Sequence, residues 1–148
     1  MASHKQNELS LKIATVHDKK ATLGLLKELF DNSVYSRIST FNQEDASKAF
    51  KGIVDGKLSD GSIILLLDRE TPVGCLVCSA IEHMFNRKEK TGVELAFWIT
   101  SSKRTLRGMK MLLQAYRYWC KTVGCTSILM GKLKTKNETE TYTIRKLG

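Results

Sequence analysis

Four basic side chains crowd the turn around Gly108 of this 148-residue chain: Lys103, Arg104, Arg107 and Lys110. The turn follows an apolar stretch at residues 93–99 and precedes a helical pattern. A loop that enters a helix presents the unpaired N–H groups of the first turn and the positive end of the helix dipole. With added cations, such a loop is suited to bind phosphate groups. We therefore predict a phosphate-binding loop; the alternative is a solvated basic helix start.

The net charge of the chain is concentrated from this loop to the C-terminus. Residues 1–100 contain 13 Lys and Arg against 13 Asp and Glu, whereas residues 101–148 contain 11 against two. The whole formal charge of +9 therefore lies in the last third of the sequence. Such asymmetry indicates an anionic partner, which could be a phosphorylated cofactor, a nucleic acid or an acidic surface.

The hydrophobic pattern on both sides of the basic loop predicts a strand followed by an amphipathic helix. Residues 92–99 are mostly apolar, as in a buried strand. After the loop, apolar side chains recur at helical spacing: Leu112, Ala115, Tyr116, Trp119 and Val123. Gly124 is placed to end that helix.

The rest of the chain alternates between strand and helix patterns. We expect strands at residues 9–16, 62–67, 73–82 and 126–130, with a turn at 68–72 and a polar loop at 83–91. Helices are predicted from Asp18 to about residue 32, from Asn42 to Gly56, and at residues 138–147. This order predicts an α/β (α+β) fold in which helices cover a mixed sheet.

Length and composition predict one globular domain spanning residues 1–148. The polar N-terminus does not resemble a signal peptide or anchor, and the longest apolar run, at residues 63–67, is too short to cross a bilayer. We therefore expect a cytoplasmic protein with no membrane partner.

The four cysteines are expected to be small buried or half-buried thiols. Cys75 and Cys78 form a C-x-x-C inside a strand pattern, where side chains three apart face opposite sides of the sheet. Cys120 falls on the side of its helix that carries Arg117 and Lys121, and Cys125 follows the helix end. Metal binding and redox or nucleophilic use are the alternatives, and no metal ligand set is predicted.

The strand, basic loop and helix together resemble the central motif of the GNAT-type N-acetyltransferases, most closely the short phage and bacterial members. The resemblance extends over about residues 9–148, and the matching positions are Ile99, Arg104, Gly108, Gly124, Asn137 and Leu147-Gly148. One residue too many separates Arg104 from Gly108, Lys110 replaces a small loop residue, and Ile144 stands where the last helix usually carries a tyrosine. The chain ends where members add further strands, which implies that the C-terminal strands are missing or shortened.

This resemblance implies a mostly antiparallel central sheet and acetyl-CoA as cosubstrate. In the family, two neighbouring strands splay apart, the pantetheine arm pairs with one of them, and the loop holds the pyrophosphate. The residues that would contact acetyl-CoA are Phe97, Trp98, Ile99, Thr100, Arg104, Thr105, Leu106, Arg107, Gly108, Met109, Lys110 and Asn137.

The resemblance also implies two catalytic candidates. Glu94 occupies a common family position for the base that deprotonates the amine, and by strand alternation it would share a face with Ala96 and Trp98. Its alternative is an ordinary strand carboxylate. Tyr142 could donate a proton to the departing thiolate, although it lies two residues before the usual position, and its alternative is a surface or core tyrosine. His83 could line the acceptor pocket or be an ordinary loop histidine.

The predicted activity is therefore acetyl transfer from acetyl-CoA to a primary amine of an unidentified protein or small molecule. Two other functions stay open: a catalytically silent acetyl-CoA-binding or interaction module, and a basic nucleic-acid-binding protein. The nucleic-acid interpretation is less favoured because the sequence has no recognisable reader motif. A homodimer is left open as the oligomeric state.

Overall fold

The computed structural model describes residues 8–57, 60–131 and 142–147. Its strands are β1 (Leu9–Ile13), β2 (Gly61–Asp68), β3 (Thr71–Glu82), β4 (Lys90–Ile99), β5 (Ser127–Gly131) and β6 (Tyr142–Lys146). Its α-helices are α2 (Lys19–Asp31), α3 (Gln43–Val54) and α4 (Leu106–Thr122). Short 3-10 helices are η2 (Val16–Asp18), η3 (Val34–Arg37) and η4 (Ser101–Lys103).

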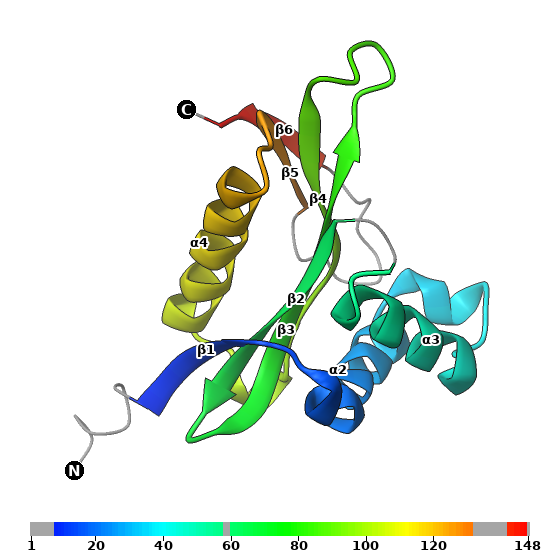
Figure 1. Ribbon diagram of the computed structural model, residues 1–148. Coiled ribbons are helices and arrows are strands. Elements are labelled where there is room, and N and C mark those ends of the chain that lie inside the picture. Colours follow the sequence, from blue (N-terminus) through cyan, green and yellow to red (C-terminus); the bar gives the residue numbers. More distant parts are fainter. Residues whose placement is uncertain (1–7, 58–59, 132–141, 148) are drawn as a thin grey trace.

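The strands form one sheet in chain order, β1-β2-β3-β4-β5-β6. Every neighbouring pair is antiparallel except β4 and β5, which run parallel. Figure 1 shows α4 on one face of the sheet and α2 with α3 on the other. The predicted α/β class, with a mostly antiparallel sheet flanked by helices, is confirmed.

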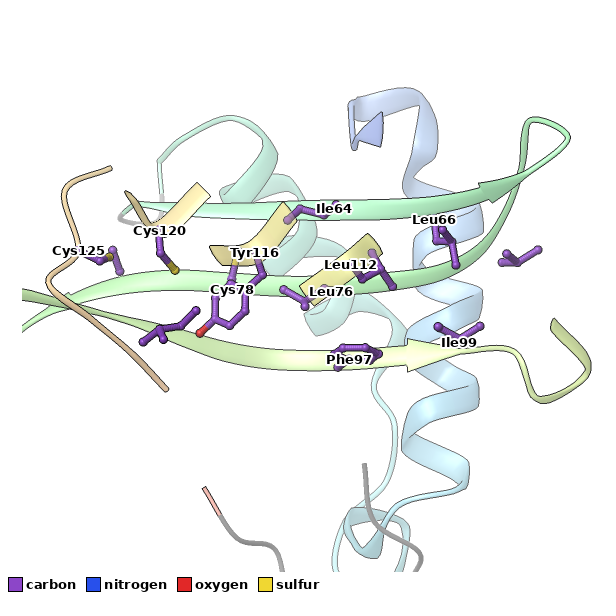
Figure 2. Close-up of a cluster of buried hydrophobic side chains, with 13 residues drawn as sticks. Ile64, Leu66, Leu76, Cys78, Phe97, Ile99, Leu112, Tyr116, Cys120 and Cys125 are labelled. Atoms are coloured by element: carbon purple, nitrogen blue, oxygen red, sulfur yellow. The ribbon is translucent and has the colours of Figure 1, made fainter. Parts of the chain in front are cut away.

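Strand alternation divides the interior into two cores. One core lies under α4 and joins Ile64, Leu66 and Leu76 to Leu112 and Tyr116 (Figure 2). The other lies under α2 and α3. Its buried residues are Ala14, Leu23, Leu25, Phe50, Ile63, Leu65, Cys75, Val77 and Trp98. The central strands are therefore apolar on both faces, as their uninterrupted hydrophobic runs require.

Several local signals act as the sequence predicts. The Asn42 side chain accepts a hydrogen bond of 3.0 Å from the Asp45 N–H and so caps α3. Gly124 follows α4 with φ +87°, a left-handed conformation that favours glycine. Asp18 precedes α2 as predicted, but its carboxylate turns back to accept the Thr15 N–H at 2.8 Å, which fixes η2 instead.

The predicted last helix at residues 138–147 is wrong for its second half. Residues Tyr142–Lys146 form strand β6, which pairs antiparallel with β5 from Ser127↔Lys146 to Gly131↔Tyr142. The segment reads Tyr-Thr-Ile-Arg-Lys, and aromatic and β-branched residues favour a pleated surface over a helix. Residues 138–141 lie outside the described residues.

Candidate functional site

Strands β4 and β5 meet at one end and then part. Their parallel register contains Thr91↔Ser127 and Gly92↔Ile128. On its other edge, β4 stays paired with β3 as far as Gly74↔Ile99. Between Val93 and Ile99, the β5-facing edge of β4 therefore has no strand partner among the described residues.

Polar side chains form hydrogen bonds at the end where β4 and β5 are paired. The Thr91 and Ser127 hydroxyls are 2.8 Å apart and hydrogen-bonded across the two strands. His83 Nε2 is hydrogen-bonded with the Thr91 hydroxyl and lies 3.4 Å from that of Ser127. His83 thus ties the loop before β4 to the point where the strands join.

A β-bulge sets the direction of the side chains along β4. Val77 is opposite Ala96 and Cys78 is opposite Glu94, so Leu95 is the extra residue, and it is 60% exposed. Glu94 consequently shares the α4 face of the sheet with Cys78, whereas Ala96 and Trp98 belong to the α2 and α3 face. The prediction that Glu94 shares a face with Ala96 and Trp98 is wrong, because simple alternation does not survive a bulge.

Glu94 is half-buried, and Tyr116 of α4 lies near it. Burial raises the pKa of Tyr116, and the nearby Cys120, Cys78 and Glu94 add to this effect. The Tyr116 hydroxyl donates a 2.7 Å hydrogen bond to the Leu129 carbonyl. Tyr116 is therefore a neutral phenol that joins α4 to β5 close to the Glu94 carboxylate.

Beyond the bulge, the backbone groups of β4 alternate between β3 and the open edge. The Thr100 N–H donates to the Val73 carbonyl at 2.9 Å, towards β3. The Ile99 carbonyl points the other way and accepts a 2.7 Å hydrogen bond from Arg104 Nε. Since direction alternates along a strand, Phe97 and Ile99 present their backbone groups to the open edge, and Trp98 and Thr100 do not.

The side chains of these four residues fix the strand between its two layers. Phe97 and Ile99 are buried in the core beneath α4. On the opposite face, the Trp98 indole N–H and the Thr100 hydroxyl both donate to Glu28 Oε1 of α2, each at 3.0 Å. Glu28 was missed from the sequence because it is one polar residue in an amphipathic helix, and only its tertiary contact with β4 distinguishes it.

The start of α4 packs directly against the sheet. Thr105 caps the helix by accepting the Gly108 N–H at 3.0 Å. A Cβ at Gly108 would lie 2.9 Å from Leu66 Cδ2 and 3.2 Å from Thr105 Oγ1, so the buried Leu66 side chain would have to shift to admit it. The absence of a side chain at Gly108 therefore lets α4 approach β2, which sets the helix N-terminus beside the end of β4.

The predicted loop cations have different surroundings. Lys103 pairs with Asp68 at 3.2 Å, and the Arg104 guanidinium carbon lies 4.2 Å from the centre of the Trp98 ring. Arg107 and Lys110 are exposed and form no ion pair within the part of the chain that the structure describes. Of the neighbouring candidates, Leu106 is 67% exposed, and Met109 packs partly against the α4 core.

Two predicted site residues lie wholly or partly outside the described residues. Asn137 lies outside the described residues, and so does the side chain of Tyr142, whose backbone belongs to β6.

The four cysteines are free and buried. Cys75 and Cys78 face opposite cores as predicted, and burial raises the pKa of each to about 12. Cys120 and Cys125 are buried as well, as expected for these thiols. In residues 8–57, 60–131 and 142–147, no group of three or more His, Cys, Asp or Glu could hold a metal ion. No helix in the same ranges is long and apolar enough to cross a membrane.

The architecture matches solved acetyltransferase structures. Aminoglycoside N-acetyltransferase AAC(6')-Iy, in complex with a bisubstrate analogue of CoA, superposes with a TM-score of 0.69 at 12% identity, over 87% of this chain and 82% of its own. The fold is that of the GNAT acetyltransferases. A GNAT family acetyltransferase from Staphylococcus aureus gives a TM-score of 0.60 at 20% identity, covering 82% of this chain and 84% of its own.

A third structure extends this similarity to a plant enzyme. Glucosamine-6-phosphate N-acetyltransferase from Arabidopsis thaliana gives a TM-score of 0.62 at 14% identity, over 81% of this chain and 79% of its own. In sequence, no known family profile and no curated protein matches the chain. The GNAT fold is thus supported by three-dimensional similarity.

Proposed function

We propose that this chain transfers an acetyl group from acetyl-CoA to a primary amine of an acceptor molecule. The observation that carries the proposal is the divergence of β4 from β5 after Gly92, with the N-terminus of α4 beside the end of β4. This arrangement leaves a strand edge for an amide-bearing arm and a helix start for phosphates. Acetyl-CoA contains both, and its thioester supplies the acetyl group.

The backbone of β4 suits the arm of the cosubstrate. Phe97 and Ile99 present N–H and carbonyl groups to the open edge, as an added strand requires. Their side chains are buried, so the edge is held rigidly. These two residues would bind the arm by their backbones, while Trp98 and Thr100 support the strand from the α2 side.

The start of α4 suits the pyrophosphate. Thr105 occupies the N–H of Gly108, which leaves the N–H groups of Leu106 and Arg107 at the end of the helix. The exposed cations Arg107 and Lys110 add positive charge there. Arg104 and Met109 are the other residues that we assign to the pyrophosphate site. Asn137 is retained as a contact on the strength of the family resemblance.

We assign amine deprotonation to Glu94. An alkyl amine with a pKa of about 10.4 is mostly protonated at neutral pH, so transfer needs a group that accepts its proton. Glu94 lies at the bulge, between the joined end of β4 and its open edge, in partly buried surroundings. Tyr142 of β6 is retained as the proton donor to the departing thiolate.

The direct test is a transfer assay with acetyl-CoA and a panel of primary amines, including amino sugars, polyamines and lysine peptides. Release of the CoA thiol and an acetylated product observed by mass spectrometry would support the proposal. If acetyl-CoA binds and no acceptor is modified, the catalytically silent interpretation would replace it.

A polyanion-binding role is the second candidate, and the outer surface of α4 favours it. The helix contains four cations, Arg107, Lys110, Arg117 and Lys121, all exposed, and no acidic residue. Nucleic-acid binding through these cations would weaken steeply with salt. The logarithm of the binding constant should fall against the logarithm of salt concentration with a slope of about −0.9 per phosphate neutralised. Titration of a short duplex at several salt concentrations tests this role.

A further inference from the structure

The side chain of Arg104 turns back from its loop to lie against β4. Its Nε donates to the Ile99 carbonyl at 2.7 Å, and its guanidinium lies 4.2 Å from the centre of the Trp98 ring. The Trp98 ring cannot readily turn away, because its indole N–H is held by Glu28 at 3.0 Å and the residue is only 7% exposed. Arg104 thus rests on a fixed aromatic platform at the end of β4.

This position coincides with the open edge of the strand. The Ile99 carbonyl is one of the backbone groups that face away from β3, and Arg104 donates to it from that open side. On the proposed function, which this inference requires, the same carbonyl would accept an amide N–H of the pantetheine arm. The guanidinium and the arm therefore compete for one acceptor and one edge.

We infer that Arg104 is a specificity residue that couples binding of the arm to the presence of the pyrophosphate. A ligand that pairs with Ile99 must displace the guanidinium from the carbonyl and from Trp98, which costs a charge-assisted hydrogen bond and a cation–π contact. A ligand with a pyrophosphate gives the displaced guanidinium a new partner, because Arg104 directly precedes the Thr105 cap of α4. A bare pantetheine arm offers no such compensation.

The consequence is a discrimination against acyl carriers that lack the nucleotide. When coenzyme A binds, the displaced Arg104 can pair with its phosphates. Short thioesters have no phosphate, so the lost contacts of Arg104 are not replaced. Arg107 is exposed in the first turn of α4 and makes neither contact with β4, so it provides a matched control.

The experiment compares Arg104→Ala with Arg107→Ala by calorimetric titration of coenzyme A, pantetheine and adenosine 3′,5′-bisphosphate. We expect Arg104→Ala to strengthen pantetheine binding about tenfold, which corresponds to about 1.4 kcal/mol, and to lower the preference for coenzyme A over pantetheine by at least that factor. Arg107→Ala should leave pantetheine affinity unchanged and weaken binding of the bisphosphate. Unchanged or weaker pantetheine binding in Arg104→Ala would overturn the inference.

A second readout does not depend on an Arg104 variant. In a Trp119→Phe background, Trp98 is the remaining tryptophan, and displacement of the guanidinium from its ring should change its fluorescence when pantetheine binds. Pantetheine binding without such a change would contradict displacement. If neither coenzyme A nor pantetheine binds the unaltered chain, the proposed function fails as well; if coenzyme A binds and Arg104→Ala has no effect, only the inference fails.

Discussion

Glu94 lies opposite Cys78 across the β3–β4 pair, on the sheet face that α4 covers. The bulge at Leu95 makes this pairing, because it reverses the expected alternation between Glu94 and Ala96. The carboxylate is therefore near the phenol of Tyr116 and away from the Trp98 face. Any amine that uses Glu94 as a base must approach the α4 side of the strand.

Replacement of this carboxylate should separate catalysis from binding. Glu94→Gln keeps the shape and removes the base, so turnover with an identified amine should fall by about 10²–10⁴-fold while acetyl-CoA affinity is kept. The loss should shrink as pH rises towards the pKa of the amine, since the substrate then loses its proton unaided. Glu82→Gln, an exposed carboxylate on β3, is the control. Equal rates for Glu94→Gln and the control at neutral pH would remove Glu94 from the mechanism.

The position of cations along α4 should matter more than their number. Arg107→Glu with Lys110→Glu should weaken coenzyme A binding by roughly tenfold or more, because the reversed charges lie at the phosphate end of the helix. Arg117→Glu with Lys121→Glu makes the same charge change at the other end and should have a small effect. Both pairs are exposed, so each substitution should alter stability by about 0.5 kcal/mol or less. Equal losses of affinity in the two double variants would indicate a non-specific electrostatic effect.

Gly92 lies at the joined end of β4 and β5, where it faces the sulfur of Cys120. A Cβ there would lie 2.2 Å from Cys120 Sγ and 3.7 Å from Cys125 Sγ, so Gly92→Ala should destabilise the fold by about 1–3 kcal/mol in urea unfolding. Gly24→Ala in α2 has nothing within 4 Å and should stabilise by about 0.5–1 kcal/mol. Adding Cys120→Ala to Gly92→Ala should cost less than the sum of the single changes. Strict additivity would show that the sulfur contact is unimportant.

Because its thiols are buried, we expect the free energy of unfolding of the chain to fall at alkaline pH. Burial raises the pKa of Cys75 to about 12, whereas an unfolded thiol has a pKa of about 8.5. The folded state therefore favours the neutral thiol, and this stabilisation is complete below about pH 8.5 and declines as pH rises towards 12. At pH 10 Cys75 alone should account for about 2 kcal/mol of the decrease, so Cys75→Ala should show a shallower pH dependence of its unfolding free energy. Parallel curves for the two proteins would contradict the assignment.

The sequence allowed accurate prediction where a signal was local. The cap at Asn42, the helix end at Gly124 and the apolar spacing of α4 each depend on residues that are neighbours in the chain. The strand, loop and helix around Gly108 could be predicted for the same reason. Their role as a candidate site follows from the divergence of β4 and β5, which depends on pairing between distant segments.

The errors arose where distant contacts decide the outcome. The bulge at Leu95 is defined by its pairing with β3, so alternation alone placed Glu94 on the wrong face. Residues Tyr142–Lys146 were expected to be helical from the family pattern, although their composition favours the strand that pairs with β5. Glu28 bonds to Trp98, and Arg104 folds back to bond to Ile99. Both contacts join β4 to residues outside that strand, and no spacing rule in the sequence predicts them.

The central claim is that the open edge of β4 and the start of α4 together bind acetyl-CoA. The most direct measurement is the unfolding free energy of the full chain at increasing acetyl-CoA, with adenosine 3′,5′-bisphosphate and pantetheine titrated separately. A ligand that binds only the folded chain should stabilise it by about 2.7 kcal/mol at a hundredfold excess over its Kd, and acetyl-CoA should exceed either fragment. An unfolding free energy that does not change at millimolar acetyl-CoA would contradict the account.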